Sequence, residues 1–427
     1  WDKVLDWNFK EPKVEWFKGA QLNITENCLD RHLATRGHEP AIIWESNDPK
    51  EQHRVLTYNE LHFKVQQFAN VLLNNGVQKG DRVCIYMGMI PELAIAVLAC
   101  ARIGAIHSVI FGGFSAQSIA DRLYDAQAEF IVTCDGAYRG NKDIPLKSVI
   151  DDALIGNRTV KKVIVYTRTR TPVSMLKGRD VWWEDEMEFA EHQVEKNAVV
   201  SFPAEEMDAE DPLFILYTSG STGKPKGVVH SSAGYMIWTN YTFINTFQYN
   251  KGDVHFCTAD IGWITGHSYI LYGPLSAGAT SLMFEGIPTF PDAGRFWDIV
   301  DKHKVNILYT APTAIRSLMG FGLDPLKGKD LEVDGTQGSQ FISGLLMALP
   351  LVNENSTLMV KNATSRPYIQ MTLRTLEQFG IESKTEGRDT YLIHGKQQYL
   401  GCEYHIEGDW SSASYWIVAS ALGAEIR

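Results

Sequence analysis

The sequence predicts an α/β fold with parallel, doubly wound sheets, and two observations carry this prediction. Short apolar runs without polar alternation recur between Val83 and Thr133. Helical patterns, each with its own start signal, separate these runs. Strands covered by helices on both faces show this pattern, because neither face of the strand contacts water. At roughly 100–200 residues per domain, the 427 residues allow two to four domains.

The first expected element is a helix that begins after Thr57. Thr57 and Glu60 have the spacing of a capping box, in which each side chain accepts a hydrogen bond from the other residue's backbone N–H. Gly76 is well placed to end the helix, since glycine adopts the left-handed conformation that closes many helices. Apolar residues at helical spacing mark the buried face: Leu61, Val65, Phe68 and Leu72.

Strands and helices are then expected to alternate along the chain. Pro91 favours the first turn of one helix, and Ser115 favours the cap of another. The run 163–166 would add a further strand to the same sheet. The other strand-like runs are 83–87, 106–111 and 130–133.

Residues 167–212 are polar and acidic, with a cluster of carboxylates between Glu184 and Glu195. We expect a solvated surface segment here. The alternative, a metal site, lacks the histidine and carboxylate spacing that a ligand set needs, so no metal ligand is predicted. Apolar structure resumes at Leu213, and the run 307–310 predicts another strand.

The character of the chain changes near Leu331. Several glycines and a proline precede this point, and no pattern from the first part repeats after it. Residues 332–427 are therefore expected to form a separate α/β unit. Its expected helices are 339–349, 369–379 and 411–422, and its expected strands are 356–360, 390–394 and 403–407.

Composition and charge exclude some classes of protein. The chain carries 40 Lys and Arg against 51 Asp and Glu, which argues against nucleic-acid binding because phosphate neutralisation needs a surplus of positive charge. The most apolar stretch, 90–111, contains Glu92, Arg102 and His107, so no membrane span is expected. Six cysteines without a CxxC pair are typical of a reducing, cytoplasmic compartment.

No secretion signal is expected from the first residues of the sequence. The chain begins at Trp1 with an acidic, aromatic segment in place of a basic and then apolar one. We also expect that residues before Trp1, including the initiator methionine, have been lost.

The strongest chemical signal is a loop of glycines, hydroxyl residues and two lysines at 218–227, directly after the apolar run 213–217. Backbone N–H groups, hydroxyls and ammonium groups together suit a chain of phosphates. The loop is not a Walker A motif, because Thr218 and Pro225 stand where that motif has glycine and a hydroxyl residue. The alternative is a flexible surface loop, although such loops rarely follow a buried strand.

This loop resembles the phosphate loop of the adenylate-forming superfamily. Four further segments resemble the AMP-forming acetyl-CoA synthetases, and the resemblance extends over residues 1–331. The resemblance implies an adenylate-forming N-terminal core that uses ATP, acetate and coenzyme A, with Mg²⁺. The four segments are 27–32, 111–115, 258–269 and 308–316.

The resemblance also implies site residues. The loop would hold the β- and γ-phosphates of ATP. The segment around Arg139 would hold coenzyme A phosphates, with a guanidinium fork from Arg139 and a point charge from Lys142. The implied phosphate-loop residues are Thr218, Ser219, Gly220, Ser221, Thr222, Gly223, Lys224 and Lys226. The implied coenzyme A residues are Gly113, Arg139, Gly140, Asn141, Lys142, Thr265 and Thr289.

Alternatives remain at several of these positions. Arg139 and Lys142 have the pattern of ordinary surface cations as well. The implied acyl pocket of Trp263, Ile264 and Thr265 could equally be core. We expect His230 and His267 to have packing roles, because the acid substrate attacks as a carboxylate and needs no protein base. No catalytic residue is assigned.

After Leu331 the adenine, ribose and lid motifs of the acetyl-CoA synthetases do not occur. Residues 332–427 instead resemble an internal segment of the 5-enolpyruvylshikimate-3-phosphate synthases. This implies a partial α/β unit of the enolpyruvyl transferase type, in which Ser339, Gln340 and Ser365 would contact the shikimate phosphate. A hydroxyl and amide set at a helix start suits an anion.

The sequence therefore predicts a chimera of two incomplete enzymes. Residues 1–331 would be a truncated acetate–CoA ligase core that is incomplete for turnover, and residues 332–427 a transferase fragment. The alternatives are a 3-phosphoshikimate 1-carboxyvinyltransferase fragment and a non-catalytic coenzyme A and nucleotide-binding chimera. Small molecules are the expected partners, and the sequence leaves the oligomeric state and the choice between acetate and propionate open.

Overall fold

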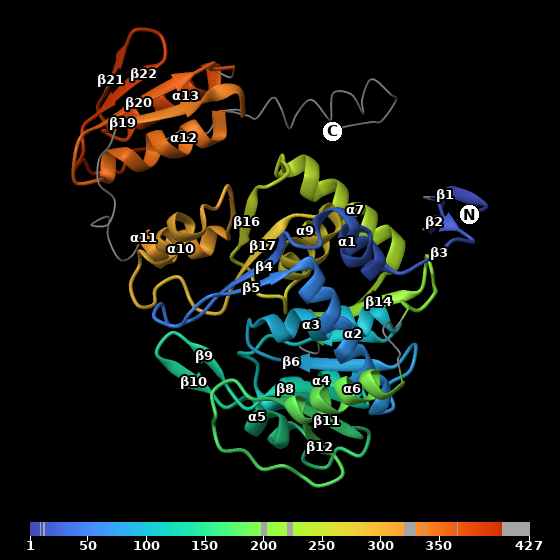
Figure 1. Ribbon diagram of the computed structural model, residues 1–427. Coiled ribbons are helices and arrows are strands. Elements are labelled where there is room, and N and C mark those ends of the chain that lie inside the picture. Colours follow the sequence, from blue (N-terminus) through green and yellow to red (C-terminus); the bar gives the residue numbers. More distant parts are fainter. Residues whose placement is uncertain are drawn as a thin grey trace. The chain divides into compact units, whose positions relative to one another are not determined.

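The computed structural model (Figure 1) describes residues 1–8, 10–11, 13–197, 203–219, 225–319, 330–337, 339–364 and 366–403. The chain divides into two units, Trp1–Gly320 and Phe321–Arg427, and each is described by itself. The expected strand 403–407 and helix 411–422 lie outside the described residues, apart from residue 403.

A seven-stranded sheet organises the first unit. Its order is β12-β11-β8-β6-β7-β14-β15, and all described neighbours are parallel except β14 and β15. The doubly wound α/β prediction is confirmed, and each apolar run predicted to be a strand of this sheet is one. The strands are β6 Arg82–Tyr86, β7 Ile106–Val109, β8 Phe130–Cys134, β11 Lys162–Tyr166, β12 Asp180–Trp182, β14 Pro212–Ser219 and β15 Pro225–Ser231.

The predicted helices that begin after Thr57, at Pro91 and after Ser115 are confirmed, whereas the two later helices of this sheet were not predicted. The Thr57 hydroxyl accepts the Glu60 N–H and the Glu60 carboxylate accepts the Thr57 N–H, so the capping box is formed. Gly76 follows the end of that helix with a positive φ of 93°. The helices are α2 Tyr58–Asn74, α3 Pro91–Arg102, α4 Ala116–Ala126, α5 Leu146–Ala153 and α6 Trp183–Asn197.

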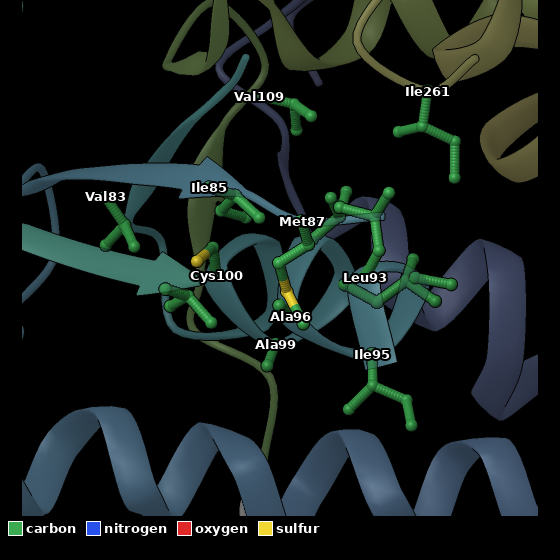
Figure 2. Packing of buried hydrophobic residues seen from close by; sticks show 14 of the residues in the cluster. Val83, Ile85, Met87, Leu93, Ile95, Ala96, Ala99, Cys100, Val109 and Ile261 are labelled. Carbon is green, nitrogen blue, oxygen red and sulfur yellow. The ribbon is translucent and has the colours of Figure 1, made fainter. Parts of the chain in front are cut away.

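Helix α3 is the centre of the core. All its residues are buried, including Glu92 and Arg102, which are paired with Arg54 and Asp30. Figure 2 shows its apolar side chains, such as Leu93 and Ala96, packed beside residues of β6 and beside Ile261. A helix that is apolar on every side is expected where other elements enclose it.

The first unit contains a second sheet, and the strands that form it were not predicted apart from the run 307–310. Its order is β18-β16-β17-β4-β5, and only β5 is antiparallel to its neighbour. The strands are β4 Pro40–Glu45, β5 Arg54–Thr57, β16 Val254–Cys257, β17 Thr280–Phe284 and β18 Ile307–Tyr309. The accompanying helices are α7 Ser232–Thr246, α8 Ile264–Gly266, α9 Gly273–Ala277, α10 Arg295–His303 and α11 Pro312–Met319.

Short elements complete the first unit. Two hairpins are formed by β1 with β2 and by β9 with β10, and β3 pairs with β13. These elements, with helix α1, are β1 Lys3–Asn8, β2 Lys13–Lys18, β3 Gln21–Leu22, α1 Arg31–Arg36, β9 Ala137–Arg139, β10 Lys142–Ile144 and β13 Met207–Asp208.

The acidic segment 167–212 is more ordered than a surface excursion. Its strand β12 pairs with β11, and the following helix α6 carries three acidic residues in its first turn. The Trp183 ring stacks on Phe68 with centroids 3.6 Å apart, and this burial anchors the segment. Acidic residues at a helix N-terminus interact favourably with its dipole.

The second unit has a four-stranded sheet in the order β19-β20-β22-β21 with helices α12 and α13. The expected helices 339–349 and 369–379 and strands 356–360 and 390–394 are confirmed, whereas β19 and β21 were not predicted. The predicted boundary at Leu331 falls inside β19, and it stays a prediction for where the two family resemblances meet. The elements are β19 Asp330–Asp334, α12 Ser339–Ala348, β20 Ser356–Lys361, α13 Arg366–Gln378, β21 Ser383–Glu386 and β22 Thr390–Ile393.

No helix in the described ranges combines the length and the apolar character that crossing a bilayer requires. The six cysteines are free thiols, and all but Cys402 are buried.

Candidate functional site

A short hairpin presents the two cations that the resemblance assigned to coenzyme A. Strands β9 and β10 pair antiparallel with Arg139 opposite Lys142, and Gly140 and Asn141 form the turn. Both cations are exposed, and neither forms a salt bridge with another described residue. Like charges facing each other across a hairpin repel, so a bound anion would stabilise this arrangement.

The hairpin turn is fixed from behind by Asn47. The Asn47 amide accepts the Gly140 N–H at 2.7 Å and donates to the Gly140 carbonyl at 2.8 Å. Gly140 has φ of +64°, and a Cβ there would lie 2.8 Å from Cδ1 of Ile287. Glycine therefore meets two separate requirements, one conformational and one steric.

A partly buried ionic network supports the same hairpin. The guanidinium of Arg168 bonds Glu51 and Glu285, each at 2.7 Å. Its Cζ lies 4.9 Å from the centroid of the Tyr138 ring, beside Arg139 in the sequence. The Glu285 carboxylate also accepts the Asn47 N–H at 3.2 Å. Paired charges of this kind hold the loops rigid.

Gly113 and Arg139 are brought together around Phe111. The Arg139 Cζ lies 4.8 Å from the Phe111 ring centroid, a cation–π contact. A Cβ on Gly113 would lie 2.6 Å from the Phe111 ring and 3.2 Å from Nη1 of Arg139. Only glycine therefore lets the backbone approach this cation so closely.

A cavity of about 190 Å³ adjoins these residues. Polar and apolar groups contribute about equally to its wall, and its polar side chains are Tyr138, Arg139, Thr258, Asp260 and Glu285. Thr265 and Thr289 are not among the described residues that line it. Thr289 lies in the loop whose Ile287 packs against Gly140, and Thr265 is half-buried in α8. Part of the implied coenzyme A set is thus gathered at one place.

The implied acyl-pocket residues do not share one cavity. The Trp263 ring is 47% exposed and contacts Phe111 and Phe114, with centroids 5.8 Å and 6.2 Å away. Ile264 instead lines a separate cavity of about 520 Å³ together with His230. Consecutive residues at the start of a helix point in different directions. The acyl pocket therefore stays a prediction.

The predicted phosphate loop connects the two strands of a hairpin at the edge of the seven-stranded sheet. Thr218 lies opposite Lys226, and Ser219 lies opposite Pro225. Thr218 and Lys226 are exposed, so a hydroxyl and an ammonium group stand at the base of the loop. The residues Gly220, Ser221, Thr222, Gly223 and Lys224 lie outside the described ones.

The two histidines lie in an aromatic cluster. His267 is buried, with its ring centroid 4.7 Å from that of Phe214, and His230 stacks on the same ring at 4.4 Å. Burial lowers the pKa of His267 to about 4. A neutral imidazole surrounded by rings fits the expected packing role.

In the second unit, Ser339 is the first residue of α12 and is 7% exposed. The side chain of Gln340 and the whole of Ser365 lie outside the described residues. The implied shikimate-phosphate site therefore stays a prediction, and Ser339 is the one predicted residue whose side chain the structure describes.

Two residues of this site had no role in the sequence analysis. Asn47 carries no local signal, because its contacts with Gly140 come from tertiary structure. Asp260 stands inside a segment that carried the family resemblance, and a carboxylate beside a glycine-rich turn was a usable signal.

Mg²⁺ finds no protein ligand set in the part of the chain described. No group of three or more His, Cys, Asp or Glu side chains there could hold a metal ion. Mg²⁺ often binds mainly through substrate phosphates, and we assign no step to it here.

Comparison with known proteins identifies the family. The family model described as AMP-binding enzyme matches residues 29–352, well over half of the chain. The chain belongs to the AMP-binding enzyme family. A model of the acetyl-coenzyme A synthetase N-terminus matches residues 1–28.

Curated relatives of this AMP-binding enzyme carry the name acetyl-coenzyme A synthetase. The protein from Halorhodospira halophila is 53% identical over 341 residues, which is 79% of this chain and 52% of the relative. The protein from Rhizobium rhizogenes is 55% identical over 329 residues, or 76% and 49% of the two chains. The chain thus spans about half the length of the curated relatives it matches. The resemblance predicted from the motifs is confirmed.

A second family model matches the C-terminal part. The model described as EPSP synthase (3-phosphoshikimate 1-carboxyvinyltransferase) covers residues 304–427. It overlaps the AMP-binding match over residues 304–352, on both sides of the predicted boundary at Leu331. The predicted resemblance to two unrelated enzymes is therefore also confirmed.

Proposed function

We propose that residues 1–331 are the N-terminal part of an AMP-forming acetate–CoA ligase. In this reaction the acetate carboxylate attacks the α-phosphorus of ATP and pyrophosphate leaves. The thiol of coenzyme A then attacks the acetyl-adenylate and AMP leaves. The relatives named acetyl-coenzyme A synthetase support this activity.

The arrangement of Arg139 around Phe111 carries the proposal. The guanidinium of Arg139 is exposed and contacts the Phe111 ring, and Gly113 has no Cβ that would crowd it. A guanidinium in this position is suited to bidentate binding of a phosphate. Lys142 lies opposite it on a turn fixed by Asn47. In a chain of net charge −11 such a local site is the way to hold an anion such as the coenzyme A nucleotide.

ATP would be held by the phosphate loop, with Thr218 and Lys226 at its base. The adenine, ribose and lid motifs of the family do not occur in residues 332–427. We therefore expect little or no turnover from this chain. A cytoplasmic location and small-molecule partners belong to the same proposal.

Isothermal titration of the full chain with coenzyme A tests the site. We expect saturable binding that the Arg139→Ala variant weakens at least tenfold, because a charged hydrogen-bonding partner is lost. Arg158→Ala is the matched control, since Arg158 is an exposed arginine that lines none of the described cavities. Equal affinity in all three proteins would refute the coenzyme A assignment.

Isotope exchange between pyrophosphate and ATP, measured with acetate, tests the expected loss of turnover. Binding of coenzyme A without exchange supports a binding module that lacks the rest of the enzyme. Rapid acetate-dependent exchange would show that the expectation of incompleteness is wrong.

A second candidate function rests on the EPSP synthase match. The second unit would then be a fragment of a 3-phosphoshikimate 1-carboxyvinyltransferase that keeps an anion site near Ser339. Shikimate 3-phosphate should protect this unit from limited proteolysis, as followed by mass spectrometry. Digestion at the same rate with and without the ligand would count against the site.

A further inference from the structure

Asp260 places a carboxylate in the same cavity as Arg139. The two side chains line the cavity of about 190 Å³ together with Tyr138 and a second carboxylate, Glu285, which is paired with Arg168. They form no salt bridge within 4.0 Å of each other among the described contacts. The Asp260 carboxylate repels a phosphate group, so its presence in a site for an anionic ligand calls for a physical explanation.

The position of Asp260 is tightly determined. One carboxylate oxygen, Oδ1, accepts the Gly262 N–H at 2.7 Å. A Cβ on Gly262 would lie 2.9 Å from the backbone of Phe111, so the turn is pressed against that residue. The next residue, Ile261, is fully buried in the core shown in Figure 2, and its N–H contacts the Met89 sulfur at 3.3 Å. The carboxyl group is therefore held in place.

The second oxygen, Oδ2, has no hydrogen-bond partner among the described residues. Burial raises the pKa of Asp260 to about 6, while the Gly262 N–H and Arg139 act in the opposite direction. Its Oδ2 is open to accept a hydrogen bond from a ligand. A desolvated carboxylate with one unused acceptor gains stability when a ligand supplies a donor.

The charges of Arg139, Lys142 and Asp260 determine how a ligand is oriented in this site. Arg139 and Lys142 are exposed on the hairpin and attract a phosphate group. Asp260 lies in the cavity behind them and disfavours entry of that phosphate. A ligand with an anionic end and a neutral, donor-bearing arm satisfies both, with the phosphate on the hairpin and the arm inside.

We propose that Asp260 accepts a hydrogen bond from the neutral, amide- and thiol-bearing arm of the ligand whose phosphate Arg139 holds. This rests on the proposed coenzyme A function and adds a binding residue to it. Asp260 then fixes the orientation of the arm without contacting the nucleotide.

Titration of the full chain with two ligands tests this role. Coenzyme A contains the arm, and adenosine 3′,5′-bisphosphate is its nucleotide without the arm. We expect Asp260→Asn to weaken the binding of coenzyme A at least tenfold, because a charged acceptor becomes a neutral one, and not to weaken the binding of the bisphosphate, because loss of the carboxylate charge removes a repulsion. The Asn side chain keeps an oxygen for the Gly262 N–H, so the turn is retained.

Asp253→Asn is the matched control. Asp253 accepts the Asn250 N–H at 2.8 Å in a similar turn and lines none of the described cavities. Its variant should bind both ligands as the parent chain does. Equal coenzyme A affinity of the parent and Asp260→Asn, or an equal loss for both ligands, would overturn the role of Asp260. Failure of the parent chain to bind either ligand would instead overturn the coenzyme A assignment and the inference with it.

Discussion

The guanidinium of Arg139 and the absent Cβ of Gly113 belong to one contact, with the Phe111 ring between them. Sequence motifs marked both residues, because glycine and arginine at those positions resemble a known family. The partners that fix them were not marked. Asn47 acts through a contact between distant segments of the chain, and Asp260 shares a cavity with Arg139 only once the chain has folded.

A buried histidine makes the stability of the folded chain sensitive to acid. His255 is fully buried among Phe243 and Phe247, and neither ring nitrogen has a described hydrogen-bond partner. Burial lowers its pKa to about 4. The unfolded chain binds a proton at this group below about pH 6.5, whereas the folded chain does not, so stability falls as the pH drops from about 6.5 to 4.

We therefore predict that His255→Phe reduces the loss of stability on acidification. The free energy of unfolding should fall by about 2 kcal/mol less between pH 7 and pH 5 than in the parent chain. Urea unfolding at the two pH values measures this difference. His38→Phe is the control, because His38 is exposed. Parallel pH profiles for the parent and His255→Phe would contradict the prediction.

At the scale of elements, local sequence patterns were sufficient to predict helices and strands where the whole pattern was present. The Thr57 and Glu60 capping box predicted the start of α2, and the unbroken apolar runs predicted β6 and β8. The acidic segment was expected to be a solvated surface segment because most of its residues are polar or acidic. The buried ring of Trp183 nevertheless anchors α6 against the rest of the unit.

The hairpin of β9 and β10 requires glycine at position 140 both for its positive φ and for the space beside Ile287. Two variants separate these requirements. Gly140→Ala adds left-handed strain and a clash with Ile287, whereas Gly156→Ala adds only the strain, because Gly156 has φ of +78° and nothing within 4 Å of a Cβ. We expect a cost of about 1 kcal/mol for Gly156→Ala and about 2–4 kcal/mol for Gly140→Ala. Denaturant unfolding measures both. Equal costs would show that Ile287 moves aside freely.

At the scale of the whole molecule, the chain holds separate cores. The core of the first unit centres on α3, and that of the second unit includes Leu358, Ile369 and Leu376. Separate cores predict separate unfolding transitions. The two family matches, one ending at residue 352 and the other beginning at residue 304, agree with a chain of two parts.

Leu358→Ala tests this independence. Leu358 is fully buried in the second core, so the truncation should destabilise that unit by about 2–5 kcal/mol. Scanning calorimetry should show one transition shifted and the other unchanged. Leu61→Ala, in the core of the first unit, should shift only the other transition. A single transition displaced by both variants would mean that the units unfold together.

The sequence alone determined the α/β class, five strands of the seven-stranded sheet (β6, β7, β8, β11 and β14), the capping of α2 and the resemblance to two enzyme families. These features depend on short-range patterns, in which burial and capping repeat at fixed spacing. Tertiary structure decided the second sheet, the turn held by Asn47 and the cavity that joins Arg139 to Asp260. Such features depend on contacts between segments far apart in the chain, and no local spacing records them.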